Sequence, residues 1–255
     1  IVLAKLRRIP EAITSHERVL SLVPDHVEAL YNRGNALQVL RRHEAALASY
    51  DLALVARPDY PEAHVNRGIT CEDLDRRGGA LAGYDPALAL RPEYLQALHN
   101  RGAILQGLNR WSEAAQSFRR VIARRPEYDY ALGNLCSCHL RTCDWDGLAE
   151  LTGRAEAAVA RGAKVVSPFS FLAMSGAPSA QLRCARTWVA DKYPRVREWA
   201  DGRGPSDRIR VAYLSADFRD HPVAFLLARL FELHDRRRFE PVAISFRRAT
   251  GEAME

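Results

Sequence analysis

A 34-residue period runs through the first half of the chain and constrains what the chain can fold into. Residues of one type recur in a single register over four periods, as prolines (Pro24, Pro58, Pro92, Pro126), alanines (Ala29, Ala63, Ala97, Ala131) and asparagines (Asn32, Asn66, Asn100, Asn134). We call each such set of equivalent positions a column. Further columns consist of glycines (Gly34, Gly68, Gly102), alanines (Ala12, Ala46, Ala80, Ala114) and ring-bearing side chains (His16, Tyr50, Tyr84, Phe118). Self-similarity at a fixed period is the signature of a repeat array.

Each period has the pattern of two helices. Apolar residues from Ala29 to about Leu40 recur at helical spacing, and a second helix is predicted from about His43 to Val55. It ends before Arg57–Pro58, because proline cannot continue the helical hydrogen bonds. Small residues such as Gly34 let two helices approach closely. The sequence therefore predicts a mainly α solenoid of helix pairs.

This pattern resembles the tetratricopeptide repeat, in which the small, aromatic and proline positions fall at the same places. The resemblance covers Ile1 to about Asp146, and Ile1 aligns inside a repeat, so we expect at least half a repeat upstream. Pro86 departs from the pattern, because Leu52 stands one period earlier. An interior proline costs about 3 kcal/mol. With Gly78 and Gly79 nearby, we expect that helix to start late or kink and the third repeat to be the least stable.

The asparagine column carries the functional signal of the repeats. Asn32, Asn66, Asn100 and Asn134 lie in the same phase on successive first helices, which makes them a stripe along one face of a solenoid. An asparagine amide both donates and accepts, so it can pair with a peptide backbone. In the tetratricopeptide family this position lies on the concave surface, which implies a ladder for an extended peptide. The alternative is hydrogen bonding between helices of the stack. Arg33, Arg67 and Arg101 face about 100° away and are not assigned to the ligand.

A less regular connector follows over 147–206. Helices are expected from Gly147 to Ala160, from Ser167 to Met174 and from a Ser179 cap to about Lys192, before a linker at Asp201–Ser206.

The cysteines and His139 of this region do not predict a metal site. Cys136 and Cys143 are seven residues apart, or about 10.5 Å along a helix, too far to share a zinc ion at about 2.3 Å per thiolate. We expect Cys136, Cys138 and Cys143 to be small core residues, and Cys71 and Cys184 to be buried as well.

The last segment, 207–255, changes fold class. Arg208–Ser215 and Phe239–Phe246 have strand composition, and Pro222 to about His234 is an apolar helix. Strand, helix and strand form a βαβ unit, so the strands should be parallel. Two strands alone do not make a stable parallel sheet, so we expect the start of a larger α/β domain, poorly ordered when isolated.

The order of these elements resembles the protein O-linked N-acetylglucosamine transferases, glycosyltransferase family 41. The resemblance rests on the repeats, the Cys143–Asp144–Trp145 turn, the connector, the Arg210–Phe218 strand and loop, and His221–Pro222. It implies a GT-B fold with two Rossmann-like lobes and inverting transfer of GlcNAc from UDP-GlcNAc to Ser/Thr hydroxyls, with no metal and no other cofactor. Animal members have a second His soon after His-Pro, where this chain has Phe225, so any role of that His does not transfer.

His221 is the candidate catalytic residue. It follows a predicted strand and precedes a helix, at the edge where open α/β sheets bind ligands. A helix N-terminus disfavours imidazolium, so a neutral ring could accept a proton or hydrogen-bond the acceptor. The family places this His in the active site. The alternative is a helix cap, and Asp217 and Asp220 are interpreted as turn and cap residues.

Composition narrows the partners. The 255 residues carry a net charge of +6 with the signs interspersed, which does not predict a nucleic-acid footprint. No apolar run approaches the roughly 20 residues of a membrane span. Five cysteines without CxxC spacing fit a reducing compartment, so we expect a cytoplasmic protein.

The sequence thus predicts the N-terminal part of a GlcNAc transferase. Its repeats would hold a protein acceptor, and its UDP-sugar donor would bind beyond Glu255, so the chain alone should be inactive. The alternative is a non-catalytic repeat scaffold for protein–protein interaction. Transfer of another sugar, or transfer to Asn, remains open.

Overall fold

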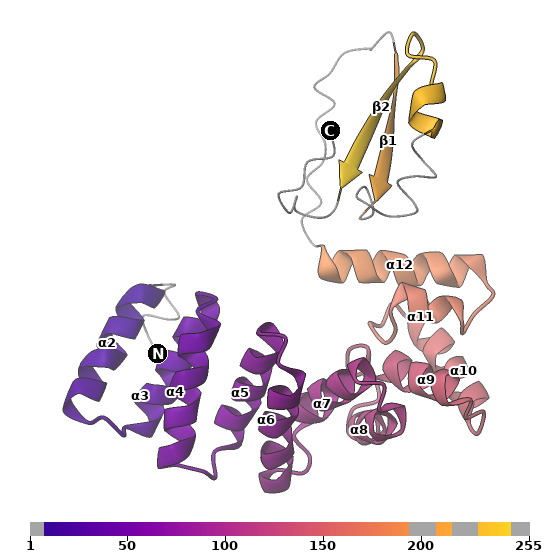
Figure 1. The fold of residues 1–255 in the computed structure, drawn as a ribbon. Helices are drawn as coiled ribbons and strands as arrows, with labels where there is room; N and C mark the ends of the chain where they lie inside the picture. Colours follow the sequence, from indigo (N-terminus) through magenta and orange to yellow (C-terminus); the bar gives the residue numbers. More distant parts are fainter. Residues whose placement is uncertain (1–7, 194–207, 216–228, 246–255) are drawn as a thin grey trace. The chain divides into compact units, whose positions relative to one another are not determined.

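The computed structural model describes residues 8–193, 208–215 and 229–245. The chain divides into two compact units, Ile1–Pro194 and Arg195–Glu255. The first unit is entirely helical in its described part, and the second contributes a pair of strands (Figure 1). Within the described residues, no helix combines the length and the apolar character needed to cross a bilayer.

The repeats form antiparallel helix pairs that stack in sequence order (Figure 1). Neighbouring helices in the chain pack against each other, so each pair contacts the pair before it and the pair after it. The helices are α2 (Ile9–Leu22), α3 (Val27–Val39), α4 (His43–Ala56), α5 (Pro61–Asp73), α6 (Arg77–Leu90), α7 (Leu95–Gly107), α8 (Trp111–Arg124) and α9 (Ala131–Thr142). The predicted solenoid is therefore confirmed, with helix ends close to those expected.

The glycine and aromatic columns interlock within each pair. A Cβ atom on Gly34 would lie 2.6 Å from the Tyr50 ring, one on Gly68 would lie 2.7 Å from Tyr84, and Gly102 meets Phe118 in the same way. The three rings are fully buried. The small residue on the first helix therefore accommodates a ring from the second helix, so the close approach predicted for Gly34 is made to an aromatic side chain.

The turn between repeats also recurs at 34-residue steps. In three of these turns an arginine that ends the second helix lies over the ring of a tyrosine three residues later. These pairs are Arg57–Tyr60 at 5.1 Å, Arg91–Tyr94 at 4.9 Å and Arg125–Tyr128 at 5.6 Å. The proline after each arginine ends the helix, as predicted.

Helix α6 does not start late. It begins at Arg77, 34 residues after the start of α4 at His43, and runs to Leu90 with Pro86 inside it. The packing of Tyr84 and Ala87, both fully buried, holds the helix on the stack. Tertiary contacts thus override the local cost of the proline, and the expected late start is wrong.

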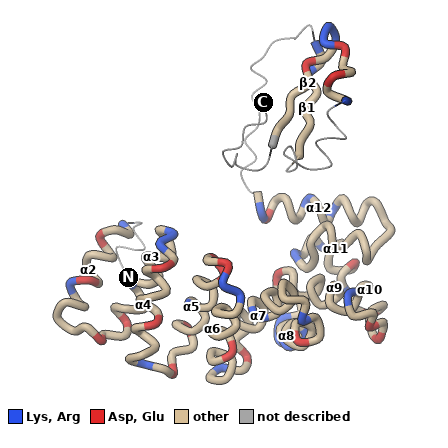
Figure 2. The backbone as a smooth tube through the Cα atoms, viewed as in Figure 1, with Lys and Arg blue, Asp and Glu red and all other residues tan. Residues whose placement is uncertain are grey.

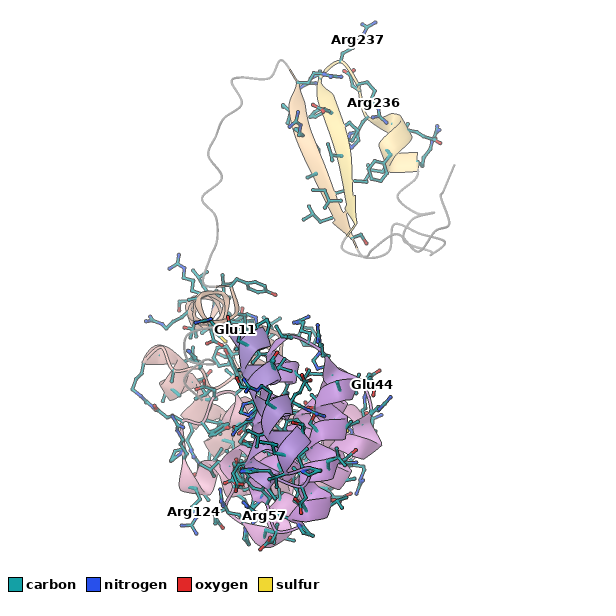
Figure 3. The ribbon with its side chains drawn as sticks, turned by 90° about the vertical axis from the view of Figure 1, so that its left-hand side faces the viewer. Glu11, Glu44, Arg57, Arg124, Arg236 and Arg237 are labelled. Atoms are coloured by element: carbon teal, nitrogen blue, oxygen red, sulfur yellow. The ribbon has the colours of Figure 1, made fainter. Side chains whose placement is uncertain are left out.

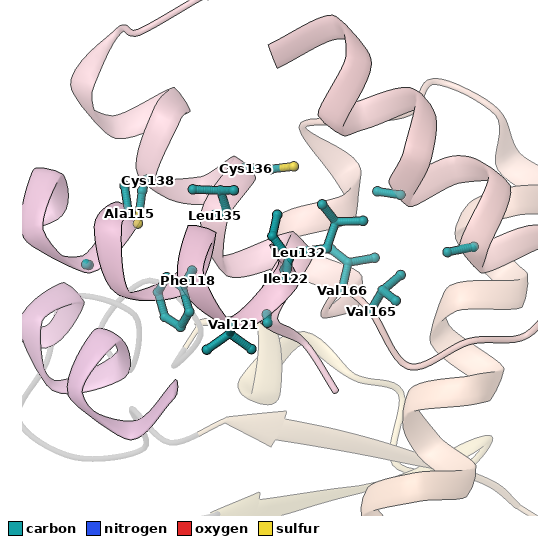
Figure 4. Packing of buried hydrophobic residues seen from close by; sticks show 14 of the residues in the cluster. Ala115, Phe118, Val121, Ile122, Leu132, Leu135, Cys136, Cys138, Val165 and Val166 are labelled. Atoms are coloured by element: carbon teal, nitrogen blue, oxygen red, sulfur yellow. The ribbon is translucent and has the colours of Figure 1, made fainter. Parts of the chain in front are cut away.

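The connector continues the stack directly. It comprises α10 (Leu148–Ala160), α11 (Pro168–Leu172) and α12 (Pro178–Lys192). The Gly133 N–H donates to the Val165 carbonyl at 2.8 Å, and Val165 and Val166 join the core of the last repeats, around Phe118 and Leu135 (Figure 4). Helices α8 to α12 therefore share one hydrophobic core.

Helices α11 and α12 of the connector begin with different caps. The Ser167 side chain accepts from the Ser170 N–H and caps α11. Helix α12 begins after Ala177, which provides no side-chain cap, and Ser179 lies inside its first turn. The predicted Ser179 cap is therefore wrong, because Pro178 already occupies the first helical position.

Asp191 ties the end of α12 to the start of α9. Its carboxylate accepts from the Tyr130 hydroxyl at 2.6 Å and from the Lys164 ammonium at 2.5 Å. The Lys192 ammonium lies 4.6 Å from the centre of the Tyr130 ring, and Trp188 packs edge-on against the same ring. These contacts fix α12 against the end of the repeat array.

In the second unit, β1 (Ile209–Ser215) and β2 (Phe239–Ser245) pair in parallel, with Ile209 opposite Phe239 and Ser215 opposite Ser245. Residues 229–233 are helical. The Tyr213 hydroxyl lies 2.6 Å from His234 Nε2, which joins β1 to the segment after this helix. The parallel pairing is as predicted. A complete βαβ unit of a GT-B lobe is not seen in the described residues, since most of the helix expected over 222–234 falls outside them.

Candidate peptide-binding site

The four asparagines occupy the same position on α3, α5, α7 and α9, and all four are partly buried. Asn66 Nδ2 donates to the Tyr31 hydroxyl at 3.1 Å and to Asn35 Oδ1 at 2.8 Å, both on the preceding first helix. Asn100 Nδ2 lies 3.4 Å from the Tyr84 hydroxyl. Hydrogen bonding within the stack thus engages the amide nitrogens of Asn66 and Asn100.

Asn32 and Asn134 differ from the other two members of the column. Neither side chain forms a hydrogen bond with any residue in the described part of the chain. The Oδ1 atom of Asn66 likewise has no donor there. These amide groups are therefore available for an external backbone, while the peptide-binding role of the column stays a prediction.

A second polar column, which sequence analysis did not identify, lies beside the asparagines. The Tyr50 hydroxyl donates to Asn35 Oδ1 at 2.7 Å and lies 3.1 Å from Gln38 Oε1. One period later the Tyr84 hydroxyl donates to Glu72. Burial raises the pKa of Tyr84 and of Glu72 above their ordinary values. The 34-residue recurrence of Gln38, Glu72 and Gln106 was the signal that could have revealed this column.

The arginine column has structural partners. The Arg33 guanidinium donates to Ser49, that of Arg67 to Asp51, and that of Arg101 to Asp85, at 3.0, 2.6 and 2.6 Å. Ser49 lies on the second helix of the same repeat as Arg33, whereas Asp51 and Asp85 lie on the second helix of the repeat before Arg67 and Arg101. Arg33 thus joins the two helices of one pair, and Arg67 and Arg101 join neighbouring pairs of the stack.

Asn134, the last asparagine of the column, lines a cavity of about 550 Å³. The cavity lies where α7 and α9 meet the start of α8 and helix α11. Its lining combines amides and hydroxyls with aromatic and aliphatic groups and one cation: Gln106, Gly107, Trp111, Asn134, Ser137, Leu140, Arg141, Phe169, Ser170 and Ala173. Sequence analysis missed this cavity, because its walls come from three segments separated along the chain.

The cysteine-rich helix α9 contributes to the core. Cys136 and Cys138 are fully buried, and burial raises the pKa of each thiol to about 11. The Arg119 guanidinium donates to His139 Nε2 at 3.0 Å, and His139 Nδ1 lies 3.1 Å from the Asp144 carbonyl. Cys143 is exposed, with a left-handed φ of 52°. The expectation of a core position is therefore wrong for Cys143, which lies just beyond the end of α9.

The candidate catalytic residue His221, together with Asp217 and Asp220, lies outside the described residues. Its proposed role in catalysis therefore remains a prediction from sequence.

Comparison with known proteins places the helical unit in one fold class. A tetratricopeptide repeat model matches residues 1–61. A MamA structure aligns with a TM-score of 0.58 at 19% identity, over 62% of this chain and 88% of that chain. YrrB, a TPR protein with an unusual peptide-binding site, gives 0.56 at 17% identity, over 72% and 87%. MamA 41-end from Desulfovibrio magneticus RS-1 gives 0.53 at 23%, over 59% and 87%.

These matches define a tetratricopeptide-repeat solenoid. At these identities the structural similarity concerns the fold alone. The search of curated proteins finds no match. The resemblance to glycosyltransferases rests on the order of the sequence elements and motifs and receives no support from these comparisons.

Proposed function

We propose that the helical unit is a protein-interaction module that binds an extended segment of a partner protein along the asparagine column. The observation that carries this proposal is the equal phase of the four asparagines along the solenoid. The last of them, Asn134, lines the cavity at α9. Two of the four side chains, those of Asn32 and Asn134, have no partner within the described residues. A free amide can satisfy both the N–H and the C=O of an extended backbone. The peptide-binding site of YrrB, a solenoid of the same fold, is consistent with this role.

The test uses substitutions that leave the stack intact. The full chain selects ligands from a random peptide library, and the affinity of a selected peptide is measured by fluorescence anisotropy. Because Asn32 and Asn134 form no side-chain hydrogen bonds in the described structure, Asn32→Ala and Asn134→Ala should not alter the melting temperature. A lost backbone hydrogen bond contributes about 0.5–1.5 kcal/mol, so each change should weaken binding by roughly 2- to 10-fold.

Gln116→Ala is the matched control, since Gln116 is an exposed amide on the second helix α8. It should leave the affinity unchanged. Asn66→Ala and Asn100→Ala should also weaken binding, but their hydrogen bonds within the stack require a parallel stability measurement. Equal affinity for the wild-type chain and all four asparagine variants would exclude the ladder.

A second candidate function is that the module serves a GlcNAc transferase by holding its protein acceptor. The sequence Arg210–Phe218 with His221–Pro222, and the parallel pairing of β1 with β2, favour this candidate. If it is correct, the gene downstream of Glu255 encodes further βαβ units. The full-length protein should then move GlcNAc from UDP-GlcNAc to peptide hydroxyls, whereas residues 1–255 alone should not. Transfer by the 255-residue chain alone, or a gene that stops shortly after Glu255, would contradict this candidate.

A further inference from the structure

The cavity at α9 has walls of two kinds. Trp111, Leu140 and Phe169 provide apolar surface, and the Phe169 side chain is 84% exposed at the start of α11. Asn134 and Arg141 face the same space. A volume of about 550 Å³ falls in the range of about 300–1,000 Å³ typical of ligand pockets. The cavity therefore suits a peptide side chain that presents both an apolar and a polar group, or two adjacent side chains.

Among the described residues that line the cavity, Arg141 is the only charged one. Its guanidinium lies 5.5 Å from the centre of the Trp111 ring, and it forms no ion pair with a carboxylate in the described part of the chain. Other arginines of the repeats pair with a carboxylate, as Arg57 does with Glu28 and Arg91 with Glu62. Arg141 is thus a cation held by an aromatic ring without a carboxylate partner in these residues.

The charged residues near the cavity do not neutralise Arg141. Arg77 donates to the carbonyl of the lining residue Gly107 at 2.7 Å, but its guanidinium also lies 3.5 Å from the Asp75 carboxylate. No Asp or Glu contributes to the described lining. The cavity accordingly presents one net positive charge, which matches a carboxylate better than the nearly two negative charges of a phosphate monoester.

We propose that this cavity binds an acidic side chain of the partner peptide, next to an apolar residue that covers Phe169. This inference rests on the proposed peptide-binding function and adds the chemistry of its recognition. The carboxylate accepts from Arg141, because a guanidinium presents a planar pair of donors to a carboxylate. The adjacent apolar side chain packs on Phe169 and Trp111, and the Asn134 amide holds the peptide backbone between the two.

The experiment compares the ligands selected by charge variants of the full chain from one random peptide array. The wild-type chain should enrich peptides with Asp or Glu beside an aromatic or aliphatic residue. Arg141→Glu should exchange this preference for Lys or Arg at the same position. Arg141→Ala should weaken binding of a wild-type-selected acidic peptide by about tenfold, the lower part of the range for a hydrogen bond to a charged group. Replacing the peptide's Glu by Gln should cause a similar loss in the wild-type chain and little further loss in Arg141→Ala.

The matched control is Arg186→Glu, an exposed arginine on α12 outside the cavity. It makes the same charge change and should retain the acidic preference. Arg141 and Arg186 are both exposed, so circular dichroism should show all variants folded.

The possible outcomes separate the two proposals. Selection of peptides without an acidic preference, or with one that Arg141→Glu leaves unchanged, would overturn the acidic site while leaving the asparagine ladder intact. Selection of no peptide at all would overturn both. If Phe169→Ser converts a dimer to a monomer in size-exclusion chromatography, a second copy of the chain occupies the cavity, which also overturns the acidic-peptide site.

Discussion

At Gly83 the backbones of two helices come into direct contact. A Cβ atom at this position of α6 would lie 2.7 Å from the Gly68 nitrogen and 2.8 Å from the His64 carbonyl oxygen, both on α5. Backbone atoms cannot move aside as the end of a flexible side chain can. Gly78, five residues earlier on the same helix, has no neighbour within 4 Å of such a Cβ. Two glycines of one helix thus serve different purposes.

This difference predicts opposite effects of one substitution. Gly83→Ala forces α5 and α6 apart and should lower the free energy of unfolding by about 1–3 kcal/mol, the usual cost of overpacking. Gly78→Ala removes only the flexibility of glycine in a helix and should raise it by up to about 1 kcal/mol. Urea unfolding of both variants measures the difference. Equal effects of the same sign would contradict the close approach at Gly83.

For single residues, the sequence predicted the structural role better at positions that recur in successive repeats than at positions that do not. The glycine column predicted close packing correctly, because three periods place a glycine at the same position. Cys143 has no such column, and its exposure follows from a left-handed residue just beyond α9. A single cysteine in a helical segment does not reveal on which side of the helix end it lies.

Among the elements, α12 is held by a carboxylate as well as by apolar contacts, since Cys184 is buried in the core but Leu182 and Val189 are exposed. The hydrogen bond from Lys164, followed by those from Tyr130 and Lys192, holds the pKa of Asp191 well below its usual range. A carboxyl group whose pKa is lowered by folding stabilises the fold above its unfolded pKa of about 3.9. That contribution is lost as the pH falls from this value through the lower pKa of the folded state.

Asp191→Asn should therefore destabilise the docking of α12 at pH 7, while the difference from the wild-type chain should shrink by pH 3. Urea unfolding at the two pH values measures this, and hydrogen exchange at pH 7 should show faster exchange in α12. Glu156→Gln, an exposed carboxylate on α10, is the control and should change neither quantity. A difference that stays constant between pH 7 and pH 3 would show that the charge of Asp191 is not responsible.

Most elements were predictable because proline marks their limits. Helices α3, α4 and α10 to α12 lie where the pattern placed them, within a few residues. The exceptions are local: α6 contains Pro86 without a late start, and α12 lacks the Ser179 cap. For α6, packing against neighbouring helices, which a single sequence does not display, determined the outcome, and for α12 it was Pro178 at the first helical position.

Across the helical unit, charge is distributed without a dominant centre. Acidic and basic residues are interspersed along the helices (Figure 2). Labelled residues such as Glu44, Arg57 and Arg124 project from the helix surface (Figure 3). In such an array stability is approximately a sum of repeat and interface contributions, so different parts of the solenoid can open separately.

The five cysteines provide a measure of this opening. Cys71 lies in α5, Cys136 and Cys138 in α9 and Cys184 in α12, all buried, whereas Cys143 is exposed. Because burial also raises the pKa of the buried thiols, iodoacetamide at pH 8 should label Cys143 rapidly and the other four only after denaturation. Peptide mass spectrometry identifies the labelled sites, and Cys143→Ser should abolish the rapid labelling. Rapid labelling of Cys136 or Cys138 in the native chain would contradict the described core.

The site was less predictable than the fold. The asparagine column could be placed on one face, since its period equals that of the fold. The cavity beside Asn134 could not, because Trp111, Arg141 and Phe169 belong to three elements that only the folded chain brings together. Recognition of the second unit as part of a transferase depends on motifs rather than on packing.

The recurrence of the arginine–tyrosine turns has a consequence for how such a chain can evolve. Three successive junctions between repeats use the same contacts at the same spacing, so duplication or loss of one 34-residue unit between them would rejoin compatible ends. Such an event would change how many asparagines precede Arg141 without altering the cavity beside it. The length of the bound segment and the identity of its anchoring residue can thus diverge independently within a lineage.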